Sequence, residues 1–504
     1  MKNYFFLFLS FLCISLNAQI KQNIRVEYDE EIADNFDVYA FEKERVALVK
    51  YTTKNPKNRK EQMFVFESLD ENLKKQKSTQ IVIEKDYRAY TSLVGADAYY
   101  ILAHNYKKGN FKLYSINPAT LEVKETKGNF GAKSYIWDWS VEGNYLYASA
   151  SSKKKLLVLM ANISTGKVTT VLPQTKTEYK LTFVDLEKVK TSSGFEMAFQ
   201  YKVKISKKEQ QTYMLRFNEN AEQVGKFLIL PKPEAETHLL TSTLTKVADD
   251  NYILTGTYSK GKRPGSANGI YFASLSESGL KFIKYYNFLD IKNFTSYLSE
   301  KKQEKIEKKK AKKEDKGEEL NLNYNCTIHD IVDLGGKYVF LGEFYYATYR
   351  TVTYTTYVNG RPVVQTRQEF DGYQYTHSAL AIFNADGSMD WSNAFEMWLS
   401  NKPFYVKQFI RMSTTDSEVK LMFVNGSNIQ AVAYNHKGSV VKSKTTEVVS
   451  TNQSGDKVKY TVESDLDFWF DNNYITSGFQ KIKNNEKEGE DKKRRVYYIN
   501  KLTF

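Results

Sequence analysis

NYILTGTYSKGKRPGSANGIYFASLSESGL, residues 251–280, contains the unit from which the whole fold is predicted to be built. Residues 252–258 and 270–275 are predicted strands, because aromatic and β-branched side chains suit a half-buried sheet. A glycine-rich loop joins the two segments, and a tight polar turn closed by Gly279 follows the second. The stretch therefore predicts a pair of antiparallel strands that leads into a further strand.

The same unit recurs eight times along the chain. First strands begin near positions 45, 98, 144, 195, 251, 337, 418 and 473, and each is followed by a partner strand. Gly, Asn, Asp and Ser form the turns after most partner strands, because Gly adopts positive φ and Asn and Asp bond their own backbone. One strand also precedes each first strand, and a short outer strand usually follows the turn. Each unit is therefore predicted to hold four strands in about 50 residues.

Four-stranded units in radial repetition make a β-propeller, and the chain resembles this all-β architecture. The resemblance implies eight four-stranded blades; seven blades with one unit misassigned, or two stacked β-domains, are the alternatives. The Gly-His…Trp-Asp, double-glycine and Ser-x-Asp-x-Gly-x-Thr-Trp patterns of known propeller classes are absent, so no characterised family is implied.

The two ends of the chain are predicted to share the last blade. The eighth unit stops at Phe504 after three strands, and residues 22–28 form a strand-like segment before the first unit. These residues are expected to supply the missing fourth strand and close the ring. Closure of this kind also removes two exposed sheet edges.

The first 19 residues are predicted to be a signal peptide. They combine Lys2, an apolar run over residues 4–16 and a small residue near the cut. The run is shorter than the roughly 20 residues that span a bilayer, and no later stretch is apolar over that length. Residues 20–504 are therefore expected to form a single exported β-propeller domain, periplasmic or extracellular, with no transmembrane segment.

The net charge and the cysteine content indicate which kinds of binding partner to expect. The net charge is +14, or 14 − 1 = +13 without Lys2, and Cys326 is the single cysteine after cleavage. A positive surplus favours anionic partners such as membrane surfaces, polyanionic glycans or nucleic acid. Because no basic block dominates, the preferred interpretation is a solubility charge spread over a large surface. A protein or glycan of the cell envelope is the expected partner, with no specific nucleic acid. The oligomeric state stays open.

A charged insertion occupies residues 294–320, in the first of two long unit spacings. Its segment 300–316 has no glycine or proline, and Glu304 and Lys308 have helical i,i+4 spacing. Few apolar side chains interrupt the charges. The segment is therefore predicted to be a solvated helix in a long loop.

A long hairpin is predicted over residues 342–379, in the second long spacing. Asn359-Gly360 is the strongest two-residue hairpin signal. Because the arms exceed the other strands, the tip is expected to project and to present Tyr349, Tyr354, Tyr357 and Arg361 for binding. The alternative is a hairpin that folds over its own blade or covers a ring face.

A carboxylate-rich strand supplies the candidate catalytic residues. Strand alternation places Asp465, Asp467, Trp469 and Asp471 on one face of DLDFWFD, and Asp138 lies in the similar Trp137-Asp138-Trp139 of the third unit. Paired carboxylates with aromatic neighbours can bind a sugar or act in glycoside hydrolysis. Asp465, Asp467 and Asp138 are thus candidate catalytic residues and Trp469 a candidate binding residue. The alternative is that the aspartates end strands and bond loop amides.

Local motifs for serine hydrolysis, phosphoryl transfer, zinc proteolysis and dinucleotide binding are absent. The five histidines are scattered, and Cys326 and His329 fall on opposite faces of a strand, so no metal and no cofactor are expected. The sequence favours an exported, non-catalytic binding or scaffolding protein for a protein or glycan partner. A glycan-active hydrolase or lyase with carboxylates near the channel mouth is the alternative.

Overall fold

The computed structural model describes residues 20–503, with some gaps. The residues between these limits that it leaves out are 33–34, 55–57, 59–60, 91–92, 96, 174–179, 192–193, 206–209, 230–236, 249, 262–264, 359, 416, 448–449 and 452. The predicted signal peptide and Asn359 of the predicted hairpin turn lie outside the described residues.

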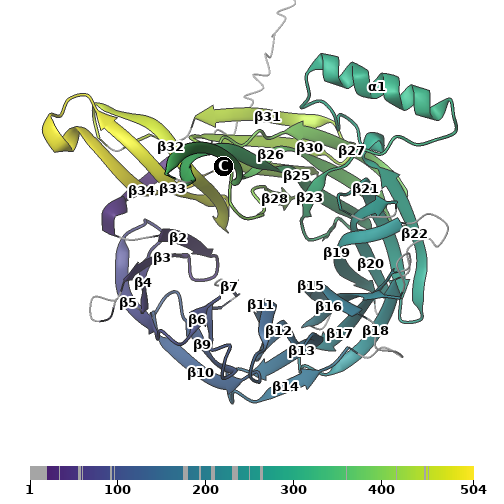
Figure 1. The fold of residues 1–504 in the computed structure, drawn as a ribbon, viewed down its shortest axis with the longest axis horizontal. Coiled ribbons are helices and arrows are strands. Elements are labelled where there is room, and N and C mark those ends of the chain that lie inside the picture. Colours follow the sequence, from purple (N-terminus) through teal and green to yellow (C-terminus); the bar gives the residue numbers. More distant parts are fainter. Residues whose placement is uncertain are drawn as a thin grey trace, which may run out of the picture.

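Eight antiparallel sheets stand side by side in a ring, with the first strand of a blade toward the centre (Figure 1). Blade 1 holds β2 (Asn35–Phe41), β3 (Val46–Lys54), β4 (Gln62–Leu69) and β5 (Lys75–Ile83). Blade 2 holds β6 (Arg88–Ala89), β7 (Leu93–Val94), β8 (Tyr99–His104), β9 (Asn110–Ile116) and β10 (Val123–Asn129). Blade 3 holds β11 (Tyr135–Glu142), β12 (Tyr145–Ser152), β13 (Lys155–Asn162) and β14 (Val168–Val171). Blade 4 holds β15 (Lys180–Thr191), β16 (Gly194–Lys204), β17 (Gln210–Asn218) and β18 (Gln223–Ile229).

The second half of the chain repeats this order. Blade 5 holds β19 (Thr237–Ala248), β20 (Asn251–Lys260), β21 (Gly269–Ser276) and β22 (Gly279–Asn287). Blade 6 holds β23 (Asn325–Ile328), β24 (Val332–Asp333), β25 (Lys337–Val358), β26 (Arg361–Asn384) and β27 (Met389–Glu396). Blade 7 holds β28 (Arg411–Thr414), β29 (Glu418–Asn425), β30 (Asn428–Asn435) and β31 (Val440–Glu447). Blade 8 holds β32 (Asp456–Phe470), β33 (Asn473–Asn484), β34 (Lys493–Thr503) and β1 (Lys21–Asp29). The predicted all-β propeller with eight blades is confirmed.

Blade 8 unites the two ends of the chain, as predicted. β1 pairs antiparallel with β34 from Lys21↔Thr503 to Asp29↔Val496. A shared hydrophobic core connects blade 8 to blade 1. Phe36 of blade 1 stacks on Tyr497 of blade 8 at 4.8 Å, and buried Trp469 donates from Nε1 to the Val46 carbonyl at 3.2 Å. Apolar side chains on both blades are thereby removed from water, which is the main stabilising term.

Four of the innermost strands, β11, β15, β19 and β32, carry β-bulges. The pairing register shifts between Ile136 and Asp138 in β11, and between Phe183 and Asp185 in β15. In blades 2 and 6 the inner strand is divided into two short strands instead. A bulge bends a strand and re-aims the side chains beside it. The alternation of side chains along these strands therefore changes at the bulge.

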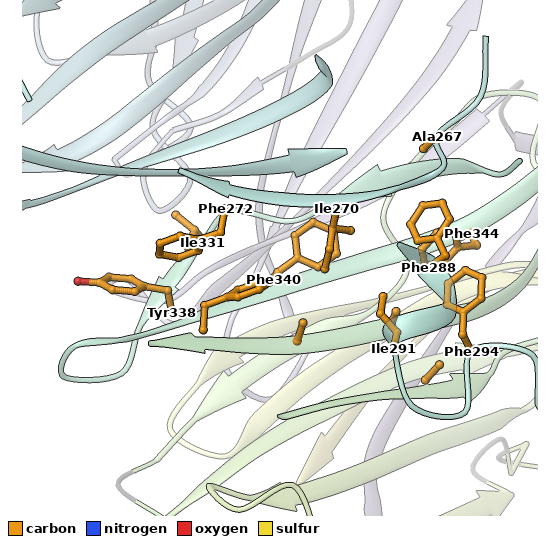
Figure 2. Packing of buried hydrophobic residues seen from close by; sticks show 14 of the residues in the cluster. Ala267, Ile270, Phe272, Phe288, Ile291, Phe294, Ile331, Tyr338, Phe340 and Phe344 are labelled. Carbon is orange, nitrogen blue, oxygen red and sulfur yellow. The ribbon is translucent and has the colours of Figure 1, made fainter. Parts of the chain in front are cut away.

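The charged insertion is anchored by its first residues and solvated afterwards. Phe288, Ile291 and Phe294 are buried in the core between blades 5 and 6, where Phe288 and Phe294 stack at 4.9 Å and meet Phe344 edge to face (Figure 2). Helix α1 (Glu300–Glu314) follows and buries no residue; it lies outside the ring in Figure 1. The predicted solvated helix is confirmed.

The inner strand of blade 7 is shorter than expected. The strand that the repeat predicts before the first strand of the seventh unit covers residues 405–412, but β28 begins only at Arg411. The amides of Phe409 and Ile410 donate instead to the fully buried Glu343 carboxylate of blade 6, at 3.0 and 2.9 Å. A side-chain acceptor thus replaces the neighbouring strand for this segment.

Ring closure should depend on a buried cation in β1. Arg25 is buried and donates to Glu27 at 2.7 Å and to Gln480 of β33 at 2.8 Å. We expect Arg25→Ala to lower the free energy of unfolding by about 2 kcal/mol, because buried Gln480 loses its charged donor and Glu27 is left with Arg494. Denaturant unfolding measures the loss. Lys21→Ala, on an exposed residue of the same strand, is the control and should change stability by less than about 0.5 kcal/mol.

Candidate functional site

The largest departures from the repeat emerge on one face of the ring. In an antiparallel blade, the connection from the second to the third strand leaves at the same end as the connection to the next blade. The β25–β26 hairpin is a connection of the first kind, and residues 397–410 and the α1 segment are connections of the second kind. We call this side of the ring the insertion face.

The tip of the β25–β26 hairpin, residues 349–368, is exposed on both of its faces. Tyr349 is 62% exposed and Tyr357 75%, Tyr354 is also exposed, and Arg361 opens a run of eight exposed residues in β26. A strand that lay on a surface would bury every second side chain. The tip therefore does not cover a ring face, and the predicted projection fits this exposure.

Polar contacts of the tip stay within the hairpin. Arg367 donates to Glu369 and lies over the Tyr354 ring at 5.5 Å, and the Tyr354 hydroxyl donates to Gln365 at 3.0 Å. A two-stranded ribbon without a packed layer is only marginally stable in water. The tip thus presents aromatic surface and two unpaired strand edges to a partner.

The base of the hairpin packs on the connection into blade 7. The Tyr373 amide donates to the Pro403 carbonyl at 2.8 Å, and Phe370 meets Phe404 edge to face at 5.9 Å. Phe404 and Tyr405 remain 69% and 63% exposed beside a cavity of about 370 Å³. The aromatic surface of the tip thereby continues onto the insertion face.

The carboxylates predicted on β32 are held in ion pairs. Asp465 pairs with Lys407 at 2.5 Å, and Arg411 donates from Nε and Nη2 to Asp467 at 2.9 and 2.6 Å. Burial raises the pKa of Asp467, and the Arg411 guanidinium opposes the shift. These pairs join blade 8 to blade 7, which favours a structural role for both aspartates.

The predicted position of Trp469 is wrong. A register shift between Phe468 and Phe470 turns Trp469 into the core, where it is fully buried, and leaves Phe468 exposed. Its side chain is not available to a ligand. Sequence alternation failed here because a bulge adds one residue to the strand.

Asp138 lies in a different arrangement, close to carboxylates that sequence reasoning missed. Its Oδ1 accepts from the Trp139 amide at 2.8 Å, and burial raises its pKa. Asp185 of β15 has the same local bond, to the Leu186 amide at 2.9 Å, and burial raises its pKa to about 6. The charges of Asp138 and Asp330 raise the pKa of Asp185 further.

Asp185 and Asp330 line a cavity of about 560 Å³ between the inner strands of blades 4, 5 and 6. Glu187 lines it too, but both of its oxygens accept from the Leu244 amide at 3.0 Å, so this carboxylate joins blade 4 to blade 5. One sequence signal was available: Asp185 and Asp138 are each flanked by apolar residues on both sides, in Val184-Asp185-Leu186 and Trp137-Asp138-Trp139.

The described residues contain neither a cluster of metal ligands nor a helix suited to span a membrane. No group of three or more His, Cys, Asp or Glu side chains is placed there to hold a metal ion. No helix in the same part of the chain has the length and apolar character that a membrane span needs. Cys326 lies in β23, and burial raises the pKa of its thiol well above the ordinary range.

No family model matches the chain, and no curated protein does. Solved structures similar to it include the polysaccharide lyase Uly1, with a TM-score of 0.38 and 8% identity over 82% of this chain and 89% of that one. The Dos1 propeller has a TM-score of 0.36 and 9% identity over 78% and 89%. The uncharacterized protein lmo1340 from Listeria monocytogenes EGD-e has a TM-score of 0.34 and 8% identity over 79% of this chain and 92% of that one. Likeness this distant carries no argument about ligand or activity.

Asp185 should make stability fall as pH rises. The pKa of Asp185 in the folded state, about 6, exceeds the ordinary value of 3.8. Between these two pH values the folded protein binds more protons than the unfolded chain, so the free energy of unfolding falls as pH rises from about 4 to about 6. Asp185→Asn keeps the acceptor for Leu186 and removes the charge. Its free energy of unfolding should match that of the unmodified protein at pH 4 and exceed it by about 2 kcal/mol at pH 7, after allowance for partial solvent screening.

The neighbouring charge provides an internal check. Asp138→Asn should lower the pKa of Asp185, because the Asp138 carboxylate raises it. A carboxyl NMR titration reads this pKa directly. An unchanged Asp185 pKa would show that the two groups do not interact.

Proposed function

We propose that this protein is an exported, non-catalytic binding or scaffolding protein of the cell envelope, and that it holds a protein partner with its projecting hairpin. The observation that carries the proposal is the tip at residues 349–368, exposed on both faces. Its tyrosines have an apolar ring and a polar hydroxyl, the combination enriched in binding surfaces. Its free edges offer main-chain groups to which a partner strand can add.

The exposed aromatics at the hairpin base support the same proposal. Phe404, Tyr405 and Tyr349 lie well outside the core, and exposed apolar surface of this kind marks interaction sites in soluble proteins. Two side-chain pairs bond across the ribbon: Gln368 donates to Thr351, and Arg350 donates to Glu369. These bonds hold the two strands together before a partner binds. Binding then orders less of the chain and costs less entropy.

A shortened hairpin tests the proposal without disturbing the blade. Arg350 faces Glu369 in the ladder, so residues 351–368 can be replaced by a two-residue Asn-Gly turn. The mature protein should capture a partner from envelope extracts, and the shortened variant should lose it while its thermal unfolding stays unchanged. Tyr354→Ser/Tyr357→Ser should weaken capture by about tenfold or more, since two exposed aromatic contacts are removed.

Tyr460→Ser is the matched control, because Tyr460 is an exposed tyrosine on β32 of another blade. It should leave capture unchanged. Equal capture by the shortened variant would contradict a role for the hairpin.

A glycan hydrolase or lyase is the second candidate, favoured by Asp185 alone. A carboxyl with a pKa of about 6 can exchange a proton near neutral pH, and it lines a cavity with Asp330 nearby. Turnover on a glycan panel that Asp185→Asn abolishes, and that Asp467→Asn leaves intact, would support this activity. Absence of turnover by the unmodified protein across the panel would count against it.

A further inference from the structure

A second cavity on the insertion face, of about 650 Å³, lies in blade 2. Its walls are the connection into β6, the turn between β8 and β9, and Tyr135 at the start of β11. It shares no lining residue with the hairpin, which belongs to blade 6. Its volume is in the range of pockets that hold small organic ligands.

Positive charge dominates the rim of this cavity. Lys85, Arg88, Lys107 and Lys108 line it together with one carboxylate, Asp86. Among the described residues, no carboxylate lies within ion-pair distance of any of these four cations. The four cations are therefore available to an anionic ligand, and they attract one before contact.

Aromatic rings form the sides. Tyr87, Tyr90, Tyr106 and Tyr135 line the cavity, and Tyr106 is 49% exposed. Trp137 supports Tyr135 edge to face at 4.8 Å. An aromatic face packs against the C–H face of a sugar ring, and phenol hydroxyls bond its hydroxyl groups.

A buried imidazole lies beneath the floor. His104 is 1% exposed, and neither ring nitrogen has a described partner in hydrogen-bond geometry. Burial lowers its pKa; the nearby Gly109 carbonyl raises it less, so the ring is neutral at pH 7. Both ring nitrogens are shielded from solvent, so the imidazole packs beneath the cavity floor as a neutral ring and the groups that face a ligand are those of the rim and sides.

The turn that carries Tyr106, Lys107 and Lys108 is held in place by blade 3. The Lys133 amide donates to the Tyr106 carbonyl at 2.8 Å, and the Phe130 amide donates to the Gly109 carbonyl at 2.9 Å. Gly109 has a φ of +80° and lies so close to Gly131 that a Cβ would come within 2.3 Å of its backbone. The cavity is thus formed before a ligand arrives, which limits the entropy lost on binding.

We propose that this cavity binds an anionic saccharide, one that carries carboxylate or sulfate groups. Cations on the rim receive the acidic groups, tyrosine rings pack on the sugar, and tyrosine hydroxyls bond its hydroxyl groups. The inference is separate from the proposed function, because it uses different residues and a different ligand class. A bounded hollow with tyrosine rings and hydroxyls on its sides favours a short acidic oligosaccharide over a nucleic-acid strand, which tracks along a continuous groove.

Titration calorimetry at physiological salt tests the proposal. The probes are an oligogalacturonate, a sulfated dextran oligosaccharide, neutral dextran of matched length, inorganic sulfate and oligothymidylate. At least one acidic oligosaccharide should bind, and neutral dextran and free sulfate should not. Arg88→Gln/Lys107→Gln should weaken binding by about tenfold, the equivalent of two charge contacts. Tyr106→Ala should also weaken it.

Lys301→Gln/Lys305→Gln is the matched control, because it removes two exposed charges from α1 and leaves the cavity unchanged. It should alter affinity less than about twofold, through long-range charge only. An equal effect of both double variants, tighter binding of oligothymidylate, or no binding of either acidic oligosaccharide would overturn the proposal. The shortened-hairpin variant should bind the saccharide normally, which separates this test from that of the hairpin.

Discussion

The pairing of β1 with β34 is the constraint on which the rest of this structure depends. Without β1 the last blade has three strands and an open outer edge. This edge lies next to the hydrophobic core that blades 8 and 1 share. Each blade buries its faces only against its two neighbours, so a ring that fails to close exposes two of them. Polar side chains reinforce contacts between blades elsewhere in the ring: buried Glu343 and partly buried Glu187 each accept backbone amides from the segment that follows in the next blade. The ring is thus held by both apolar contacts and hydrogen bonds.

Repetition made most of this architecture predictable. The predicted first strands fall on the second strand of each blade, and residues 22–28 lie within β1. Two predictions about individual segments were wrong, each for a local structural reason. Residues 405–410 leave the sheet because their amides bond a side chain, and Trp469 turns inward because a bulge shifts the register. Neither the side-chain acceptor nor the bulge leaves a mark in the amino-acid composition of its segment. Strand propensity and the alternation of side chains therefore could not predict them.

The candidate sites were harder to predict because each is assembled from several blades. Burial raises the pKa of Asp185, and the charges of Asp138 in blade 3 and Asp330 in blade 6, both far away in the sequence, raise it further. The blade 2 cavity combines two connections with Tyr135 of the next blade. No local motif can encode such groupings. The hairpin was predictable because one continuous segment contains it, with its turn signal and its tyrosines in a single run.

The geometry of ring closure also fixes how the molecule responds to force. Lys21 stands opposite Thr503 in the β1–β34 ladder, so the two ends of the fold lie side by side. Tension applied between the ends peels β1 from its neighbour, and the ladder hydrogen bonds break one after another instead of sharing the load. A ring that is thermodynamically secure is therefore mechanically soft at its seam, and an anchored copy pulled by its termini opens first at blade 8.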